Sequence, residues 1–432
     1  MMAMPALIFV LAPGFADDPD KFDLAVLLTR ICFPYLIFVS LMALFSGVLN
    51  AAGRFVAAAF APTLLNVIFI LVLLAIAAQD IGGTRAAGIW LSWGVFAGGI
   101  VQLAMVVWAA RRANLLLFPR LPQWTPGVKR LFALMGPGII AGGITQINIV
   151  VGTMIASFMP GAVTYLYLAD RVYQLPLGIV GIAIGVVLLP DIARRLKAGD
   201  TTGVQHQQNR AAEFAMALTL PAAMALIIVP QEIVSGLFEG GAFTAEDAQQ
   251  TGRALMAFGF GLPAFVLIKV LQPAYFAREN TLTPMYYAGV SVAVNVALSL
   301  ALFPFFQHVG IAIATSVAGW VNVVLLAISL RRRGELHLDT RLRNRIGKMA
   351  LACLAMGLVL GVVAFGFGMN APDPGETGRF LHNVFTLAVL VTSGIVTYGA
   401  VAYLTGALTR DDLATALRRK GTEQPDPLQE AD

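Results

Sequence analysis

The chain of 432 residues is 58% hydrophobic and only 12% charged, whereas a typical soluble domain is about 25% charged. Its apolar runs of roughly 20 residues are long enough to cross a bilayer as helices, and they are continuous rather than alternating, which excludes a β-barrel. The composition therefore predicts an all-α fold, a polytopic transmembrane helical bundle, and it attributes the net charge of +5 to loops at the membrane surface rather than to a nucleic acid partner.

Eleven full spans are predicted in chain order, after an apolar N-terminal stub. The stub, residues 1–12, is too short to cross a membrane and lacks the positively charged start of a secretory signal. The predicted spans lie near residues 24–50, 62–79, 86–110, 132–158, 162–189, 211–229, 253–277, 283–305, 309–331, 346–368 and 380–405.

The loops between these spans differ strongly in their content of Lys and Arg. One side of the membrane collects 22 of these residues and the other side only four. Cytoplasmic loops carry the excess of positive charge. The sequence therefore predicts a cytoplasmic C-terminus, followed by a polar tail at residues 408–432.

Sequence motifs for catalysis or metal binding are missing. The chain has no G-x-x-x-x-G-K-[ST] stretch and no Ser/His/Asp arrangement. Cys32 and Cys353 lie singly in apolar runs, and the four histidines are scattered at loops and helix ends. We therefore expect neither an enzyme nor a bound cofactor or metal.

Four charged residues lie well inside the predicted spans, away from their ends, and make the membrane interior net cationic: Arg30, Asp170, Arg171 and Lys269. Arg171 is about nine residues into its span, roughly 14 Å deep at 1.5 Å per residue, in a hydrocarbon core about 30 Å thick. An arginine at that depth must face protein or water and needs a partner.

Two interpretations of Asp170 and Arg171 are open. Both could join a charge network that holds two helices together, or Arg171 could bind an anionic ligand in a central cavity while Asp170 orients it or balances its charge. Adjacent helical residues point about 100° apart, so the two charges address different partners. A guanidinium binds phosphate or carboxylate in a bidentate manner, which favours the binding site.

Lys269 and Arg30 lie nearer the ends of their spans. Their long side chains could reach the membrane surface, so each is either a candidate for substrate binding or an interfacial anchor. Pro34 and Asn66 are the same number of residues apart as Pro263 and Asn295. This equal spacing suggests a parallel internal repeat of two bundles, with any binding site between them.

Several stretches of the chain resemble the MurJ (MviN) family, the lipid II flippases of bacterial peptidoglycan synthesis. They are APGF at 12–15, FPYLIFVSLMALFSGVLNAAGRFVAAAFAPTLLNV at 33–67, MGPGI at 135–139, YLADRVYQLPLGIVGIAIGVVLLP at 167–190, GAFTAEDAQQTGRALMAFGFGLPAF at 241–265 and KVLQPAYFARENTLTP at 269–284.

The resemblance implies a transporter of two six-helix lobes with two further helices that line a groove for a lipid tail. Residues 1–112 would then be an incomplete N-terminal lobe without the first two helices of the family, 131–331 the C-terminal lobe, and 346–407 the additional pair. On that pattern the chain is truncated at its N-terminus, and we expect it not to flip lipid efficiently as written.

The resemblance also implies a function and a site. The expected substrate is an undecaprenyl-pyrophosphate-linked peptidoglycan precursor, moved from the inner to the outer leaflet of the bacterial cytoplasmic membrane. Arg171 and Asp170 match charges of the family's site, and the expected partners are the anionic lipid-linked substrate, membrane lipids and a coupling ion, with the chain a monomer. A small-molecule efflux antiporter of the same superfamily is the alternative, and a non-transporting membrane scaffold is a third possibility.

Overall fold

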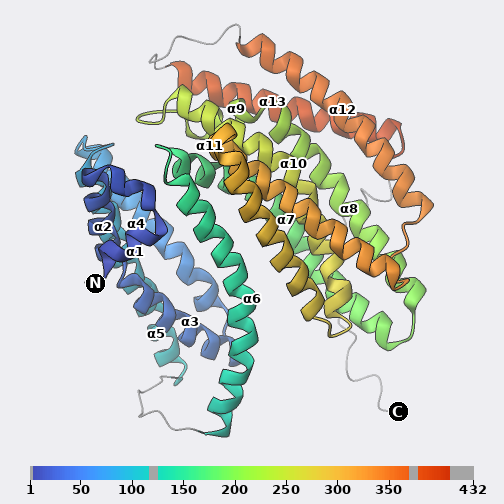
Figure 1. The fold of residues 1–432 in the computed structure, drawn as a ribbon, viewed down its shortest axis with the longest axis horizontal. Coiled ribbons are helices and arrows are strands. Elements are labelled where there is room, and N and C mark those ends of the chain that lie inside the picture. The colour runs from blue at the N-terminus through green and yellow to red at the C-terminus, as the bar shows by residue number, and fades with distance from the viewer. Residues whose placement is uncertain (1–2, 116–124, 369–377, 409–432) are drawn as a thin grey trace. The chain divides into compact units, whose positions relative to one another are not determined.

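The computed structural model describes residues 3–115, 125–368 and 378–408. In these ranges every regular element is a helix, apart from an isolated bridge between Gly240 and Phe243 (Figure 1). The all-α prediction is therefore confirmed. The predicted tail at 408–432 lies outside the described residues beyond Leu408.

The chain divides into two compact units, of which the first comprises Met1–Val163 and Gly240–Thr244. Helix α5 is its centre and packs against three other helices of the unit, α2, α3 and α4. Gly99 on α5 makes this packing possible, because a Cβ there would lie 2.7 Å from the Tyr35 ring. The bounds of its elements are α1 Met4–Leu11, η1 Pro13–Asp17, α2 Pro19–Cys32, α3 Tyr35–Ala51, α4 Val56–Ala78, α5 Arg85–Arg112 and α6 Pro126–Ala156.

Helix α6 falls in this first unit, although the resemblance assigns residues from 131 onwards to the second lobe. The expected domain boundaries at 112, 131 and 346 therefore remain predictions.

The second unit comprises Thr164–Glu239 and Ala245–Asp432. Helix α10 is the most buried of the candidate membrane spans in the described part of the chain, and it packs against α8, α9 and α11. Tyr275 near its end is 1% exposed, and its hydroxyl donates to the Leu326 carbonyl at 2.8 Å. The helices are α7 Ala162–Lys197, α8 Thr201–Ile228, α9 Pro230–Phe238, α10 Ala245–Phe276, α11 Leu282–Arg332, α12 Thr340–Gly368 and α13 Gly378–Leu404.

Helix α11 covers two of the predicted spans, 283–305 and 309–331. Its backbone is broken at Gln307, where φ is 52° and ψ is −133°, a region that residues with a Cβ rarely adopt. Within the described residues, eight helices are long and apolar enough to cross a membrane, counting α2 and α3 together as Pro19–Ala51. The transmembrane bundle is confirmed, while the number of eleven spans remains a prediction.

The short helix α9 was not predicted from the sequence. It begins at Pro230, directly after α8 ends at Ile228. Proline is favoured in the first turn of a helix and is disfavoured in its interior. The same residue therefore ends one helix and starts the next, and it brings α9 against α13.

A cluster of charges ties the start of α12 and the segment before it to α8. Glu213 on α8 is only 6% exposed and accepts from Arg210 and Arg345, and from Arg341 at 3.4 Å. Arg210 also pairs with Asp339, which precedes α12. Most of these side chains are substantially buried, so removing one member of the cluster should cost more stability than breaking an exposed surface pair.

Asp339 gives the cluster a pH dependence. Burial alone would raise the pKa of its carboxyl, but the Leu342 N–H, at 2.7 Å, and Arg210 outweigh this and lower the pKa below its ordinary value of 3.8. A carboxyl with a lowered pKa in the folded state stabilises the fold above its unfolded pKa, and this contribution is lost as the pH falls through the folded value. We expect Asp339→Asn to reduce the loss of thermal stability between pH 6 and pH 3, measured as the unfolding midpoint in detergent. Asp80→Asn, at an exposed turn, is the control, and an unchanged pH dependence in Asp339→Asn would contradict the assignment.

Candidate functional site: Arg171 on α7 and an apolar groove beside α13

Arg171 lies on an exposed face of α7. Its guanidinium carbon is 4.7 Å from the centroid of the Tyr167 ring, one turn earlier on the same helix. Such a cation–π contact orients a guanidinium without neutralising it. Among the described residues no acid forms an ion pair with Arg171, so its charge is available to a ligand.

Asp170 is oriented differently, as expected for adjacent helical residues. It is half-buried and accepts a hydrogen bond from the Gln174 side-chain amide, one turn further along α7. The prediction that Asp170 and Arg171 address different partners is consistent with this geometry. Asp170 influences Arg171 through its nearby charge rather than through a direct ion pair.

The opposite face of α7 packs on α10. Tyr173 is 7% exposed, and its ring lies 5.4 Å from the Phe258 ring and 5.7 Å from the Phe265 ring, both on α10. Near the start of α7, the Tyr165 hydroxyl donates to Asp247 at 2.8 Å. These contacts place Tyr165 and Tyr173 against α10, while Arg171 lies on an exposed face of the same helix.

Lys269 is exposed on α10. Its side chain comes near α7 at a different turn from the one that carries Arg171. A Cβ on Gly181 would lie 4.0 Å from Cγ of Lys269. Gly181 is ten residues beyond Arg171, about 15 Å along the helix axis. Lys269 therefore meets α7 about 10 residues beyond Arg171 rather than beside it.

Arg30 is exposed in the last turn of α2. It belongs to the first unit, whereas Asp170, Arg171 and Lys269 belong to the second. As for metals, the described residues contain no group of three or more His, Cys, Asp or Glu side chains placed to hold an ion.

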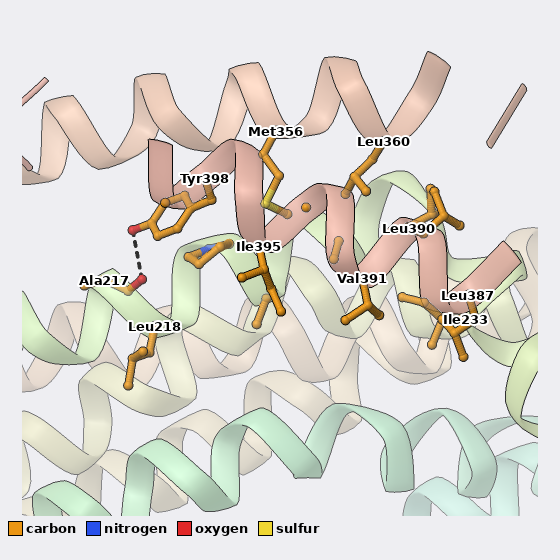
Figure 2. Close-up of a pocket in the computed structure, with 16 residues that line it drawn as sticks. Ala217, Leu218, Ile233, Met356, Leu360, Leu387, Leu390, Val391, Ile395 and Tyr398 are labelled. Atoms are coloured by element: carbon orange, nitrogen blue, oxygen red, sulfur yellow. Dashed lines mark hydrogen bonds between the residues drawn. The ribbon is translucent and has the colours of Figure 1, made fainter. Parts of the chain in front are cut away.

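An apolar groove of about 420 Å³ lies between α8 and α9 on one side and α12 and α13 on the other. Figure 2 shows Met356 and Leu360 from α12 together with Leu390 and Val391 from α13. Ile395 lines the groove and is 69% exposed, so the groove is accessible from outside. The Tyr398 hydroxyl donates to the Ala217 carbonyl at 2.8 Å and links α13 to α8 (Figure 2).

The contribution of α8 and α9 to this groove was missed from the sequence. The resemblance implied only that residues 346–405 line a groove. A signal was nevertheless present, because small residues recur on one face of α8, at Ala217, Pro221 and Ala225. They leave room between α8 and α13 for an apolar chain.

Comparisons with known proteins agree with this architecture. The family model "Lipid II flippase MurJ" matches residues 1–371. A probable lipid II flippase MurJ of Rhizobium tropici is 44% identical over 432 residues, which is 100% of this chain and 80% of that protein. Its counterpart from Rhizobium meliloti is 46% identical over 421 residues, 97% of this chain and 78% of that protein.

A solved structure supports the same fold. It is described as lipid II flippase MurJ in an inward closed conformation, and it covers 93% of this chain and 80% of its own with a TM-score of 0.71 at 23% identity. The family match and the two relatives agree with the resemblance, and they do not favour the efflux alternative. The chain therefore belongs to the MurJ family of lipid II flippases.

Proposed function

We propose that the chain moves lipid II, an undecaprenyl-pyrophosphate-linked peptidoglycan precursor, from the inner to the outer leaflet of the bacterial cytoplasmic membrane. The observation that carries the proposal is the family match over residues 1–371, joined by relatives at 44% and 46% identity. Proteins of this family are named as flippases rather than enzymes. A flippase has to bind its cargo on one side of the membrane and release it on the other, so it needs binding surfaces rather than catalytic groups.

The two parts of the cargo have different chemistry, and the second unit offers a place for each. Arg171 supplies a planar, permanently charged guanidinium for the pyrophosphate. The groove between α8 and α13 supplies an apolar surface for the isoprenoid tail, whose burial is favourable in proportion to its area. Lys269 and Arg30 are proposed as further contacts for anionic parts of the cargo at other stages of transport.

We further propose a monomer with a cytoplasmic C-terminus that uses the membrane potential or an ion gradient as its energy source. The orientation rests on the excess of Lys and Arg in the loops on one side. A net cationic interior responds to the potential, because one elementary charge is worth about 2.3 kcal/mol per 100 mV.

The direct test of the function is binding and translocation of lipid II by the purified chain. Labelled lipid II in proteoliposomes should become accessible to an impermeant reagent faster than in protein-free vesicles, and lipid II should bind the chain in native mass spectrometry. Absence of both would contradict the proposal. Translocation of a small cationic dye without lipid II binding would support the efflux alternative instead.

The groove gives a separate prediction. Gly399 lines it, and a Cβ there meets nothing within 4 Å. Gly399→Leu should fill part of the groove and weaken binding of lipid II with its full undecaprenyl tail about tenfold, while a short-tailed analogue binds as before. Because leucine has the higher helix propensity, α13 should not be destabilised.

Gly289→Leu is the matched control for this substitution. Gly289 lies on α11, outside the groove, and its Cβ position is equally open. Equal losses for long and short tails in Gly399→Leu, or the same loss in Gly289→Leu, would contradict the role of the groove.

A further inference from the structure

A second pocket, of about 160 Å³, lies where α9 meets α12 and α13. Its wall is polar, in contrast to the apolar groove beside it. Charged and hydrogen-bonding side chains of α13 and of α9, including the residue that ends α9, line it: Glu232, Glu239, Arg379, His382, Asn383 and Thr386. The pocket is formed within the second unit alone.

Of the two acids in this pocket, one has a basic partner and the other has none among the described residues. Glu239 pairs with Arg379 at 2.6 Å, and the two side chains are only 10% and 23% exposed. Glu232 has no ion pair among the described residues, and burial raises the pKa of its carboxyl. A cation in the pocket would offset the energetic cost of burying the Glu232 carboxylate by pairing with it.

Two polar atoms in the wall lack a partner in the described structure. They are Nδ2 of Asn383 and Oγ1 of Thr386, and Thr386 is only 6% exposed. Buried polar groups in proteins are nearly always hydrogen-bonded. The amide nitrogen can only donate, whereas the hydroxyl can donate or accept, so the pocket offers donors as well as the Glu232 acceptor.

The pocket and the apolar groove are both lined by α9, α12 and α13. Ile233 and Leu387 line the groove, and they are the sequence neighbours of Glu232 and Thr386, which line the pocket. A molecule with a small zwitterionic end and a long apolar chain would therefore satisfy both surfaces at once.

We propose that this pocket binds the ethanolamine headgroup of a membrane phospholipid, with the primary ammonium on Glu232 and the phosphate beside Asn383 and Arg379. An ammonium donates three hydrogen bonds to acceptors such as a carboxylate and a hydroxyl. A choline headgroup has the same charge but no N–H donors, so the pocket should distinguish the two.

The test is retention of lipid by the purified full chain in native mass spectrometry, with no lipid II present. Phosphatidylethanolamine should be retained about tenfold more strongly than phosphatidylcholine with the same acyl chains, since a charge-assisted hydrogen bond corresponds to about that factor. Glu232→Gln should abolish the preference, and Thr386→Val, which keeps the volume, should reduce it several-fold. Glu246→Gln, an exposed acid on α10, should leave it unchanged.

Equal retention of the two lipids by the unchanged chain would overturn the proposal, whether or not the variants fold. A preference that survives in Glu232→Gln would overturn it as well. If an amine-bearing lipid II, but not phosphatidylethanolamine, loses affinity in Glu232→Gln, the ammonium belongs to the cargo and the phospholipid assignment is wrong. Since the main assay contains no cargo, its failure would leave the proposed transport function intact.

Discussion

Arg171→Ala should weaken the binding of lipid II by about 10-fold to 100-fold. A hydrogen bond to a charged group contributes about 1.5–3 kcal/mol, and 1.4 kcal/mol corresponds to a factor of ten in affinity. Because Arg171 has no ion pair among the described residues and Asp170 keeps its hydrogen bond from Gln174, removing Arg171 breaks no salt bridge in the free protein. The loss should therefore appear in cargo binding, measured as the dissociation constant of lipid II, and hardly in the thermal unfolding midpoint.

Two further variants make this result specific. Arg171→Lys should fall between the unchanged chain and Arg171→Ala, because lysine keeps the charge but loses the bidentate fork. Arg194→Ala is the matched control: it removes an arginine from the same helix, where the side chain is 77% exposed and only 3.6 Å from Asp191. A dissociation constant in Arg171→Ala that equals that of Arg194→Ala would show that Arg171 does not contact the cargo.

Glu213→Gln should lower the free energy of unfolding by about 3 kcal/mol. Removing one partner of a buried ion pair typically costs about 3–5 kcal/mol, and the partial exposure of Arg341, at 50%, places the expected value at the lower end. Arg210 and Arg345 are 18% and 12% exposed and would lose the carboxylate between them. Thermal or denaturant unfolding in detergent measures the effect.

The charge cluster can be separated from a general loss of packing by a double variant. Arg345→Met in the Glu213→Gln background removes a charge that would otherwise stay buried, so the double variant should be more stable than the sum of the single effects predicts. Additive losses would indicate that Glu213 acts through packing alone. Glu246→Gln, at an exposed position, should leave the unfolding free energy within about 0.5 kcal/mol of the unchanged chain.

Much of the fold followed from the sequence because long apolar runs in lipid have few alternatives to the helix. Each of the eleven predicted spans overlaps a helix, from α2 and α3 at 24–50 to α13 at 380–405. Helix ends were less predictable, since α8 begins at Thr201, ten residues before its predicted span. The segment 201–210 is polar, and hydropathy does not detect a helix that continues outside the membrane.

The predicted internal repeat shows that residues with the same spacing in the sequence can lie in different structural environments. Asn295 is buried and accepts from Ser299 at 3.3 Å, whereas Asn66 is exposed. Pro34 lies at the break between α2 and α3, while Pro263 is inside the continuous helix α10. Equal spacing of proline and asparagine therefore does not establish equivalent positions in two bundles.

The candidate site could be predicted only in part. A charge deep in an apolar run identified Arg171 and Asp170, because such a residue is costly without a role. Neither the groove wall from α8 and α9 nor the polar pocket at Glu232 could be derived, because both depend on the packing of α9, a helix too short to be recognised by hydropathy. The position of Lys269 beside Gly181, about 15 Å along α7 from Arg171, likewise depends on which turns of two helices meet.

The central claim is that the Arg171 guanidinium binds the pyrophosphate of the cargo. The most direct measurement compares the dissociation constant of lipid II with that of a neutral undecaprenyl-linked saccharide that lacks both phosphates, in the unchanged chain and in Arg171→Ala. We expect the unchanged chain to bind the pyrophosphate-bearing lipid at least about tenfold more tightly than the neutral lipid. In Arg171→Ala the ratio of the two dissociation constants should fall close to one. An undiminished preference in Arg171→Ala would contradict the account.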